Sequence, residues 1–106
     1  MATLLDVFEE AAADTPEVEV VKAPDGSMTW AAHGRVFAEL SADGSAATFL
    51  LDPIVAGAAA RTPEVSRSAR GPGWVEMRPK SIDGHVADRA GAWFISGYRR
   101  LTGPGG

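Results

Sequence analysis

Cysteine is absent from this chain of 106 residues, and histidine occurs only twice. Without cysteine the chain has no disulfide, no thiolate zinc site and no cysteine nucleophile, and the absence fits a reducing compartment. Neither His33 nor His85 has a second histidine at helical spacing, so a metal site would need further carboxylates from distant segments. We therefore predict that the protein works without a metal, a disulfide or a covalent cofactor.

Long hydrophobic runs are also missing. No run of 18 apolar residues occurs, so we expect no helix that crosses a membrane. The first thirteen residues contain Asp6, Glu9 and Glu10 but no lysine or arginine, which is not the pattern of a secretory signal. We expect a cytoplasmic protein with one domain over 1–106, an ordered core over about 3–101 and a flexible tail over 102–106.

Basic residues are scarce in the first part of the chain. Residues 1–60 hold Lys22 and Arg35 against ten acidic residues, for a net charge of −8, whereas residues 61–106 carry a net charge of +4. One interpretation is a molecule with two charged faces, of which the basic one attracts an anionic partner. In the other, which we favour, the two halves lie side by side and their charges largely neutralise each other.

Helical and alternating patterns follow one another along the chain. Thr3 is the expected N-cap of a helix over 4–13, which ends before Pro16. Four short strands joined by turns rich in Asp and Gly are expected over 18–22, 28–32, 36–42 and 46–51. Connections this short join antiparallel strands. In the third strand, alternation predicts that Phe37 and Glu39 share one face.

The sequence from Asp52 onwards predicts two more helices and one more strand. Asp52 caps a helix that starts at Pro53 and continues to about residue 60. Further segments are a short helical turn at 64–68, a glycine-rich loop at 71–73, a strand from 74 to Pro79, and a helix from a cap at Ser81 or Asp83 to 101. The predicted fold class is α+β, with a five-stranded antiparallel sheet and helices on one face. The predicted order is helix, four strands, helix, strand, helix.

Three short segments, together with this order of elements, are similar to those of a known protein family. The segments are Trp30–Ala38 (WAAHGRVFA), Trp74–Met77 (WVEM) and Ser96–Arg99 (SGYR). Together they make the chain resemble the MmcQ/YjbR-like family of small bacterial proteins. The resemblance implies a five-stranded antiparallel sheet with flanking helices, and a protein often described as DNA-binding through a double-wing arrangement.

The remaining candidate for a functional site is a basic segment at 61–80. It has a net charge of +3, and its candidate nucleic-acid-binding residues are Arg61, Arg67, Arg70, Trp74, Arg78 and Lys80. Guanidinium groups suit phosphate because their planar fork donates two hydrogen bonds. Trp74 is the tryptophan that we expect to be partly exposed, while Trp30 and Trp93 are expected in the core.

No catalytic motif accompanies this segment. No serine lies in a Gly-x-Ser-x-Gly motif, and neighbouring acidic residues such as Glu9 and Glu10 point in different directions on a helix. We therefore predict a non-catalytic binding protein whose partner is another protein or a small ligand, with a homodimer as one form of such association. The alternative is weak DNA binding through backbone contacts, which the isoelectric point near 5.0 disfavours.

Overall fold

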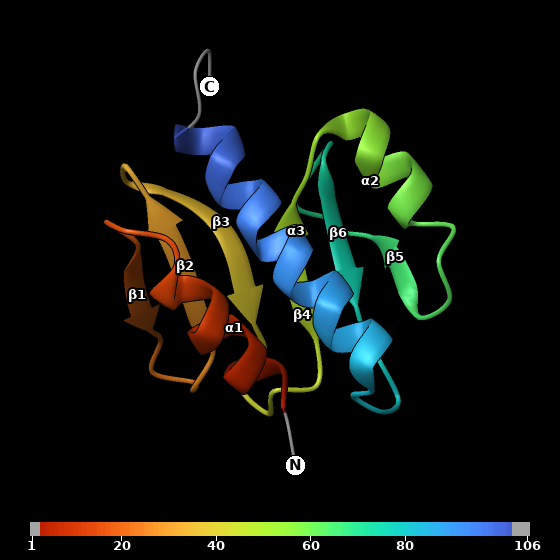
Figure 1. Cartoon of the computed structure of the whole chain (residues 1–106), viewed down its shortest axis with the longest axis horizontal. Coiled ribbons are helices and arrows are strands. Elements are labelled where there is room, and N and C mark those ends of the chain that lie inside the picture. Colours follow the sequence, from red (N-terminus) through yellow and green to blue (C-terminus); the bar gives the residue numbers. More distant parts are fainter. Residues whose placement is uncertain (1–2, 103–106) are drawn as a thin grey trace.

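The computed structural model describes residues 3–102, and in that range it contains three helices and six strands (Figure 1). In chain order they are α1 (Leu4–Ala13), β1 (Glu19–Lys22), β2 (Met28–Ala32), β3 (Arg35–Leu40), β4 (Ala47–Leu50), α2 (Pro53–Ala59), β5 (Val65–Arg67), β6 (Trp74–Met77) and α3 (Gly84–Thr102). The predicted α+β class is confirmed. No helix in the described range has both the length and the apolar character needed to cross a membrane.

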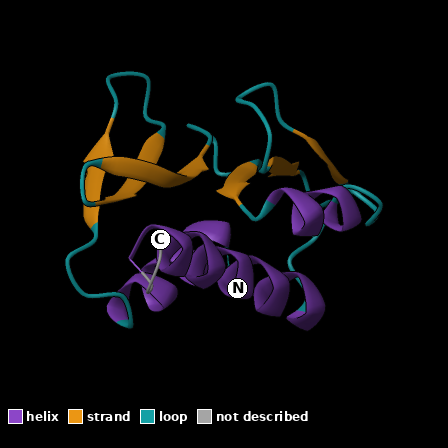
Figure 2. Cartoon of the chain, turned by 90° about the horizontal axis from the view of Figure 1, so that it is seen from above, coloured by secondary structure: helices purple, strands orange, loops and turns teal. Residues whose placement is uncertain are grey.

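The strands form one antiparallel sheet in the order β1-β2-β3-β4-β6-β5. The helices lie on one side of this sheet, and several loops rise on the other side (Figure 2). We call the side without helices the open face. The long helix α3 crosses the middle of the sheet, with α1 beside it and α2 next to β5 and β6 (Figure 1).

The predicted helix starts agree with the observed caps. Thr3 and Asp6 exchange side-chain and backbone hydrogen bonds in a capping box at the start of α1. Asp52 accepts a hydrogen bond from the N–H of Ile54 and so caps α2. Asp83 accepts one from the N–H of Val86, which identifies Asp83 rather than Ser81 as the side chain that caps the start of α3.

The prediction of five strands is wrong, because residues 64–68 contain a sixth strand and not a helical turn. Glu64 has φ +68°, a left-handed conformation that interrupts any helix. Val65 then lies opposite Met77, and the rest of β5 pairs with β6 in the same register. The observed order is therefore helix, four strands, helix, two strands, helix. A three-residue strand with one buried side chain, Val65, carries too short a pattern to be recognised from sequence.

The prediction that Phe37 and Glu39 share a face is also wrong. Between β2 and β3 the register shifts, so that Trp30 lies opposite Ala38 but Ala31 lies opposite Val36, and Phe37 has no partner in β2. A bulge of this kind adds one residue and breaks the two-residue alternation. Phe37 consequently packs on the helix side, fully buried, whereas the half-buried Glu39 stays on the open face.

Aromatic side chains fill the space between the sheet and the two long helices. Phe8 of α1 packs edge-on against Trp30 and Phe94 with ring centroids 4.8 and 5.2 Å apart, and Phe37 packs against Phe94 at 5.0 Å. Trp30 is 1% exposed, so its predicted core position is confirmed. Trp93 is partly buried and packs edge-on against Phe49.

The last helix extends one residue beyond the predicted core. Thr102 belongs to α3, where its hydroxyl donates a hydrogen bond to the carbonyl of Tyr98. The prediction that a flexible tail begins at residue 102 is therefore wrong for that residue. Residues 103–106 lie outside the described range.

Candidate nucleic-acid and ligand-binding site

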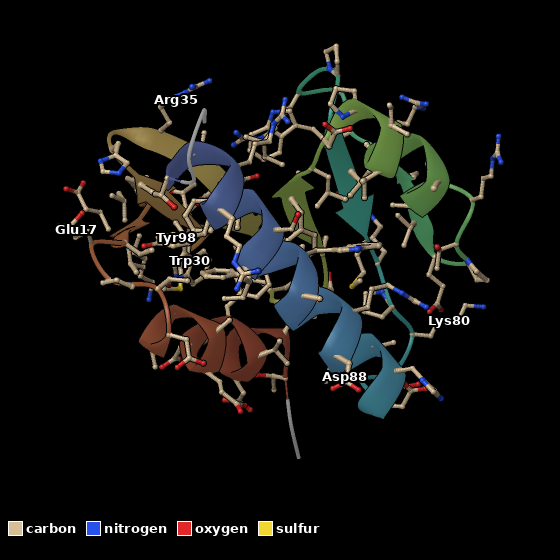
Figure 3. All side chains as sticks on the ribbon, turned by 45° about the horizontal axis from the view of Figure 1, so that its top comes forward. Glu17, Trp30, Arg35, Lys80, Asp88 and Tyr98 are labelled. Carbon is tan, nitrogen blue, oxygen red and sulfur yellow. The ribbon has the colours of Figure 1, made fainter. Side chains whose placement is uncertain are left out.

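The five basic residues predicted to act together are spread over different parts of the molecule. Arg61 follows α2, and Arg67 ends β5 on the helix side, where its guanidinium lies beside Gly57 of α2. Arg78 follows Met77, which faces the helices, so alternation turns Arg78 towards the open face. Lys80 lies near the opposite end of the molecule from Arg35 (Figure 3). All five residues are exposed, but no single surface collects them.

Arg70 and Trp74 do come together. The guanidinium carbon of Arg70 lies 4.8 Å from the ring centroid of Trp74, a cation–π contact. The same guanidinium donates a hydrogen bond to the carboxylate of Glu39, so it reaches from the β5–β6 loop across to β3. Trp74 is half-buried, in agreement with the prediction of partial exposure.

The loop that carries Arg70 is fixed at both ends. Ser68 accepts a hydrogen bond from the N–H of Arg70, and the carbonyl of Gly73 accepts one from the N–H of Leu51 at 2.6 Å. Gly73 has φ +86°, and a Cβ on it would lie 2.5 Å from the carbonyl oxygen of Leu51. Only glycine fits there. The glycine-rich segment 71–73 therefore leads into β6, as predicted, and holds the loop against the end of β4.

Polar side chains form a row across the open face. Glu39 of β3, Thr48 of β4 and Glu76 of β6 lie opposite one another in register. Thr48, between the two glutamates in this row, is only 8% exposed. Each glutamate is paired with an arginine, Glu39 with Arg70 and Glu76 with Arg78 at 3.0 Å. Two of the predicted phosphate-binding arginines are therefore already paired with carboxylates.

A hollow of about 790 Å³ lies next to the Arg70–Trp74 pair. We call it the arginine hollow, and its lining consists of Arg35, Val36, Leu50, Arg70, Gly71, Pro72, Trp74, Arg100 and Leu101. The start of β3, the start of β6 and the end of α3 meet at this end of the molecule (Figure 1). Sequence reasoning did not select Arg35 or Arg100, because both lie far along the chain from the basic segment.

Within residues 3–102 no three histidine, aspartate or glutamate side chains gather as a metal site requires. The prediction of a metal-independent protein stays a prediction.

Comparison with known proteins gives no match to a family model, to a curated protein or to a solved structure. The resemblance to the MmcQ/YjbR-like family therefore stays a prediction that rests on the three motifs. The fold and the geometry of the open face are the basis for any statement about function.

Proposed function

We propose that this chain is a non-catalytic binding protein and that its ligand contacts the open face around Arg70 and Trp74. The observation that carries the proposal is the Arg70–Trp74–Glu39 contact, in which a half-buried aromatic ring and a guanidinium group lie together on the helix-free side. A ring and a planar cation offer a stacking surface and directed hydrogen bonds at one place. Such a pair suits recognition of a ligand that has both an anionic group and an apolar part.

The histidines and the paired carboxylates of the open face support binding rather than catalysis. His33 lies in the exposed β2–β3 turn and His85 in the exposed first turn of α3, so neither imidazole lies in a buried site. The carboxylates of the open face that pair with arginines, Glu39 and Glu76, are accepting hydrogen bonds. This pairing of carboxylates with arginines supports the non-catalytic role that we propose.

DNA is the second candidate ligand, and the Arg70–Trp74 pair favours a single strand over a duplex. Bases stack on aromatic rings, and arginine adds phosphate contacts. A duplex held by the whole segment 61–80 has less support, because Arg67 lies on the helix side, away from the open face that carries Arg70 and Trp74. Any DNA contact would then involve fewer residues than the segment 61–80 predicted from the sequence.

The proposed function is tested by comparing what the protein retains from a cell extract. Wild type, a double variant Arg70→Gln/Trp74→Ala and the matched control Arg99→Gln are each incubated with extract, and the bound small molecules and nucleic acids are measured by mass spectrometry. We expect one class of compound on wild type and on Arg99→Gln but not on the double variant. An identical bound set on all three proteins, or chemical conversion of a bound compound, would contradict the proposal.

The DNA candidate is tested by fluorescence anisotropy with a labelled single strand and a duplex at low and moderate salt. If a single strand is the ligand, Arg70→Gln should reduce the slope of log affinity against log salt by about 0.7, the value for one lost phosphate contact. The absence of binding even at low salt would eliminate DNA and leave a small ligand or a protein as the partner.

A further inference from the structure

We infer that the arginine hollow is a binding site for a small organic anion, whose carboxylate or phosphate end lies between Arg35 and Arg100 and whose apolar body packs towards Trp74 and Leu50. This inference deepens the proposed function and rests on it. It assigns two new residues, Arg35 and Arg100, to the site and specifies the class of ligand.

Three cations reach the hollow from three separate elements. Arg35 begins β3, Arg70 lies in the β5–β6 loop, and Arg100 lies in the last turn of α3. Figure 3 shows the side chain of Arg35 projecting from the ribbon at this end of the molecule. Like charges gathered at one place repel one another unless an anion lies among them. The lining is therefore prepared for a negatively charged group.

The carboxylates near the hollow do not fully compensate these cations. Arg70 is paired with Glu39, and Arg100 is paired loosely with Asp52 at 3.5 Å, with both side chains about half exposed. Within the described part of the chain, Arg35 has no carboxylate at ion-pair distance. The three arginines and the two carboxylates, Glu39 and Asp52, together carry a net charge of +1. A ligand with one negative charge would therefore neutralise them.

Among the residues that the structure describes, no acidic residue lines the hollow itself, since neither Glu39 nor Asp52 belongs to its lining. The end of α3 contributes partial negative charge from its last carbonyls, which Arg99 and Arg100 in the final turn offset. The electrostatic character of the lining thus favours anions over cations.

The other side chains of the lining are mostly apolar, which favours an organic ligand over a bare inorganic ion. Val36, Leu50 and Leu101 form the apolar part together with the ring of Trp74. The volume of about 790 Å³ falls in the range of 300–1,000 Å³ that is usual for sites of small molecules. Guanidinium forks bind carboxylate and phosphate groups in the same bidentate way, so both end groups fit the chemistry.

The test uses a matched set of probes, followed by nuclear magnetic resonance. The probes are 1-naphthyl phosphate and 1-naphthoate, with inorganic phosphate as the anion alone and 1-naphthol as the ring alone. Signals from the indole N–H of Trp74 and the Nε–H of Arg35 and Arg100 report on the hollow. We expect both naphthyl anions to shift these signals and to bind at least about tenfold more tightly than inorganic phosphate, because they also bury an apolar surface. The more tightly bound of the two identifies the preferred end group.

Variants connect the binding to the two newly assigned residues. Arg35→Gln and Arg100→Gln should each reduce the affinity for the more tightly bound naphthyl anion by about tenfold. This is the usual effect of losing one hydrogen bond to a charged group. Arg99→Gln removes the same charge from the neighbouring position of α3, which does not line the hollow, and should change affinity by less than about twofold.

Two outcomes would overturn the inference. The first is the absence of any shift at Trp74, Arg35 and Arg100 with either naphthyl anion at about 10 mM, which corresponds to negligible affinity. The second is binding that Arg70→Gln abolishes but that Arg35→Gln and Arg100→Gln leave unchanged. That second result would leave the proposed function intact, because the ligand would still contact the open face at Arg70. Failure of the proposed function is recognised separately, by an unchanged bound set in the extract experiment.

Discussion

Gly97 determines how closely α3 can lie against the sheet. A Cβ at this position would be 2.9 Å from the carbonyl oxygen of Leu50 and 3.2 Å from that of Phe37. Backbone atoms of two strands cannot move aside as a flexible side chain can, so the helix would have to shift. Gly91 differs, because a Cβ there would meet only a methyl group of Val7 at an ordinary 3.8 Å.

We predict opposite effects of alanine at these two glycines. Gly97→Ala should lower the free energy of unfolding by about 1–3 kcal/mol through overpacking, and Gly91→Ala should raise it by up to about 1 kcal/mol through helix propensity. Urea unfolding followed by circular dichroism measures both values. Equal stability changes in the two variants would show that α3 does not approach the sheet as described.

Single residues differ in how far their roles could be predicted from sequence. The caps at Thr3 and Asp52 were predictable because a cap is a local contact within three residues. The burial of Trp30 was predictable from its strand position and size. Arg35 and Arg100 were not, because their meeting in the arginine hollow depends on how α3 crosses the sheet.

At the scale of elements, α2 depends on a side chain that has two partners. One carboxylate oxygen of Asp52 accepts a hydrogen bond from the N–H of Ile54 at 2.9 Å, and the other accepts one from Arg100 at 3.5 Å. The first contact satisfies the start of α2, and the second links it to the end of α3.

Two substitutions at this position separate the cap from the ion pair. Asp52→Ala should lower the free energy of unfolding by about 0.5–2 kcal/mol, because the N–H of Ile54 loses its acceptor. Asp52→Asn keeps an oxygen for the cap and loses only an exposed ion pair, so it should cost less than about 1 kcal/mol. Thermal unfolding of both variants checks the order. A loss as large for Asn as for Ala would mean that the ion pair, and not the cap, stabilises α2.

Elements with repeated patterns were predictable, whereas those defined by pairing were not. The observed α1 has the predicted bounds, and β1 to β4 lie within a residue or two of the predicted strands. The strand β5 exists because β6 offers it a partner, and the bulge at Phe37 exists because β2 and β3 pair out of step. Both depend on a neighbouring strand, which a pattern within one segment does not contain.

At the scale of the whole molecule, charges from the two halves of the chain meet. Arg70 and Arg100 come from the basic second half, and their partners Glu39 and Asp52 come from the acidic first half. These contacts favour the interpretation in which the halves lie side by side and neutralise each other. The arginine hollow lies near both contacts, where the compensation is incomplete.

The acid stability of the molecule should depend on two hairpin turns. Hydrogen bonds from the hydroxyl and backbone N–H of Ser45 lower the pKa of Asp43 to about 2. Hydrogen bonds from Ser27 lower the pKa of Asp25 in the same way. A carboxylate whose pKa is lower in the folded state stabilises the fold above its unfolded pKa near 3.8, and this contribution is lost as the pH falls towards the folded value.

We therefore predict that the melting temperature falls between about pH 4 and pH 2 and that Asp43→Asn makes this fall shallower. The matched control is Asp88→Asn, which removes an exposed carboxylate on α3 that has no hydrogen bond or ion pair within the described residues. This control should follow the wild-type curve. The same fall in Asp43→Asn as in wild type would contradict the role of the β3–β4 turn.

The order of strands in the sheet has a consequence for how the chain reaches its folded state. Four of the five strand pairings join strands that follow each other directly, and only the pairing of β4 with β6 spans an intervening helix and strand. Hairpins close short loops quickly, whereas closing the segment between Leu50 and Trp74 costs more chain entropy. We therefore expect the slowest step in forming this sheet to be the docking of the β5–β6 hairpin onto the meander of β1 to β4.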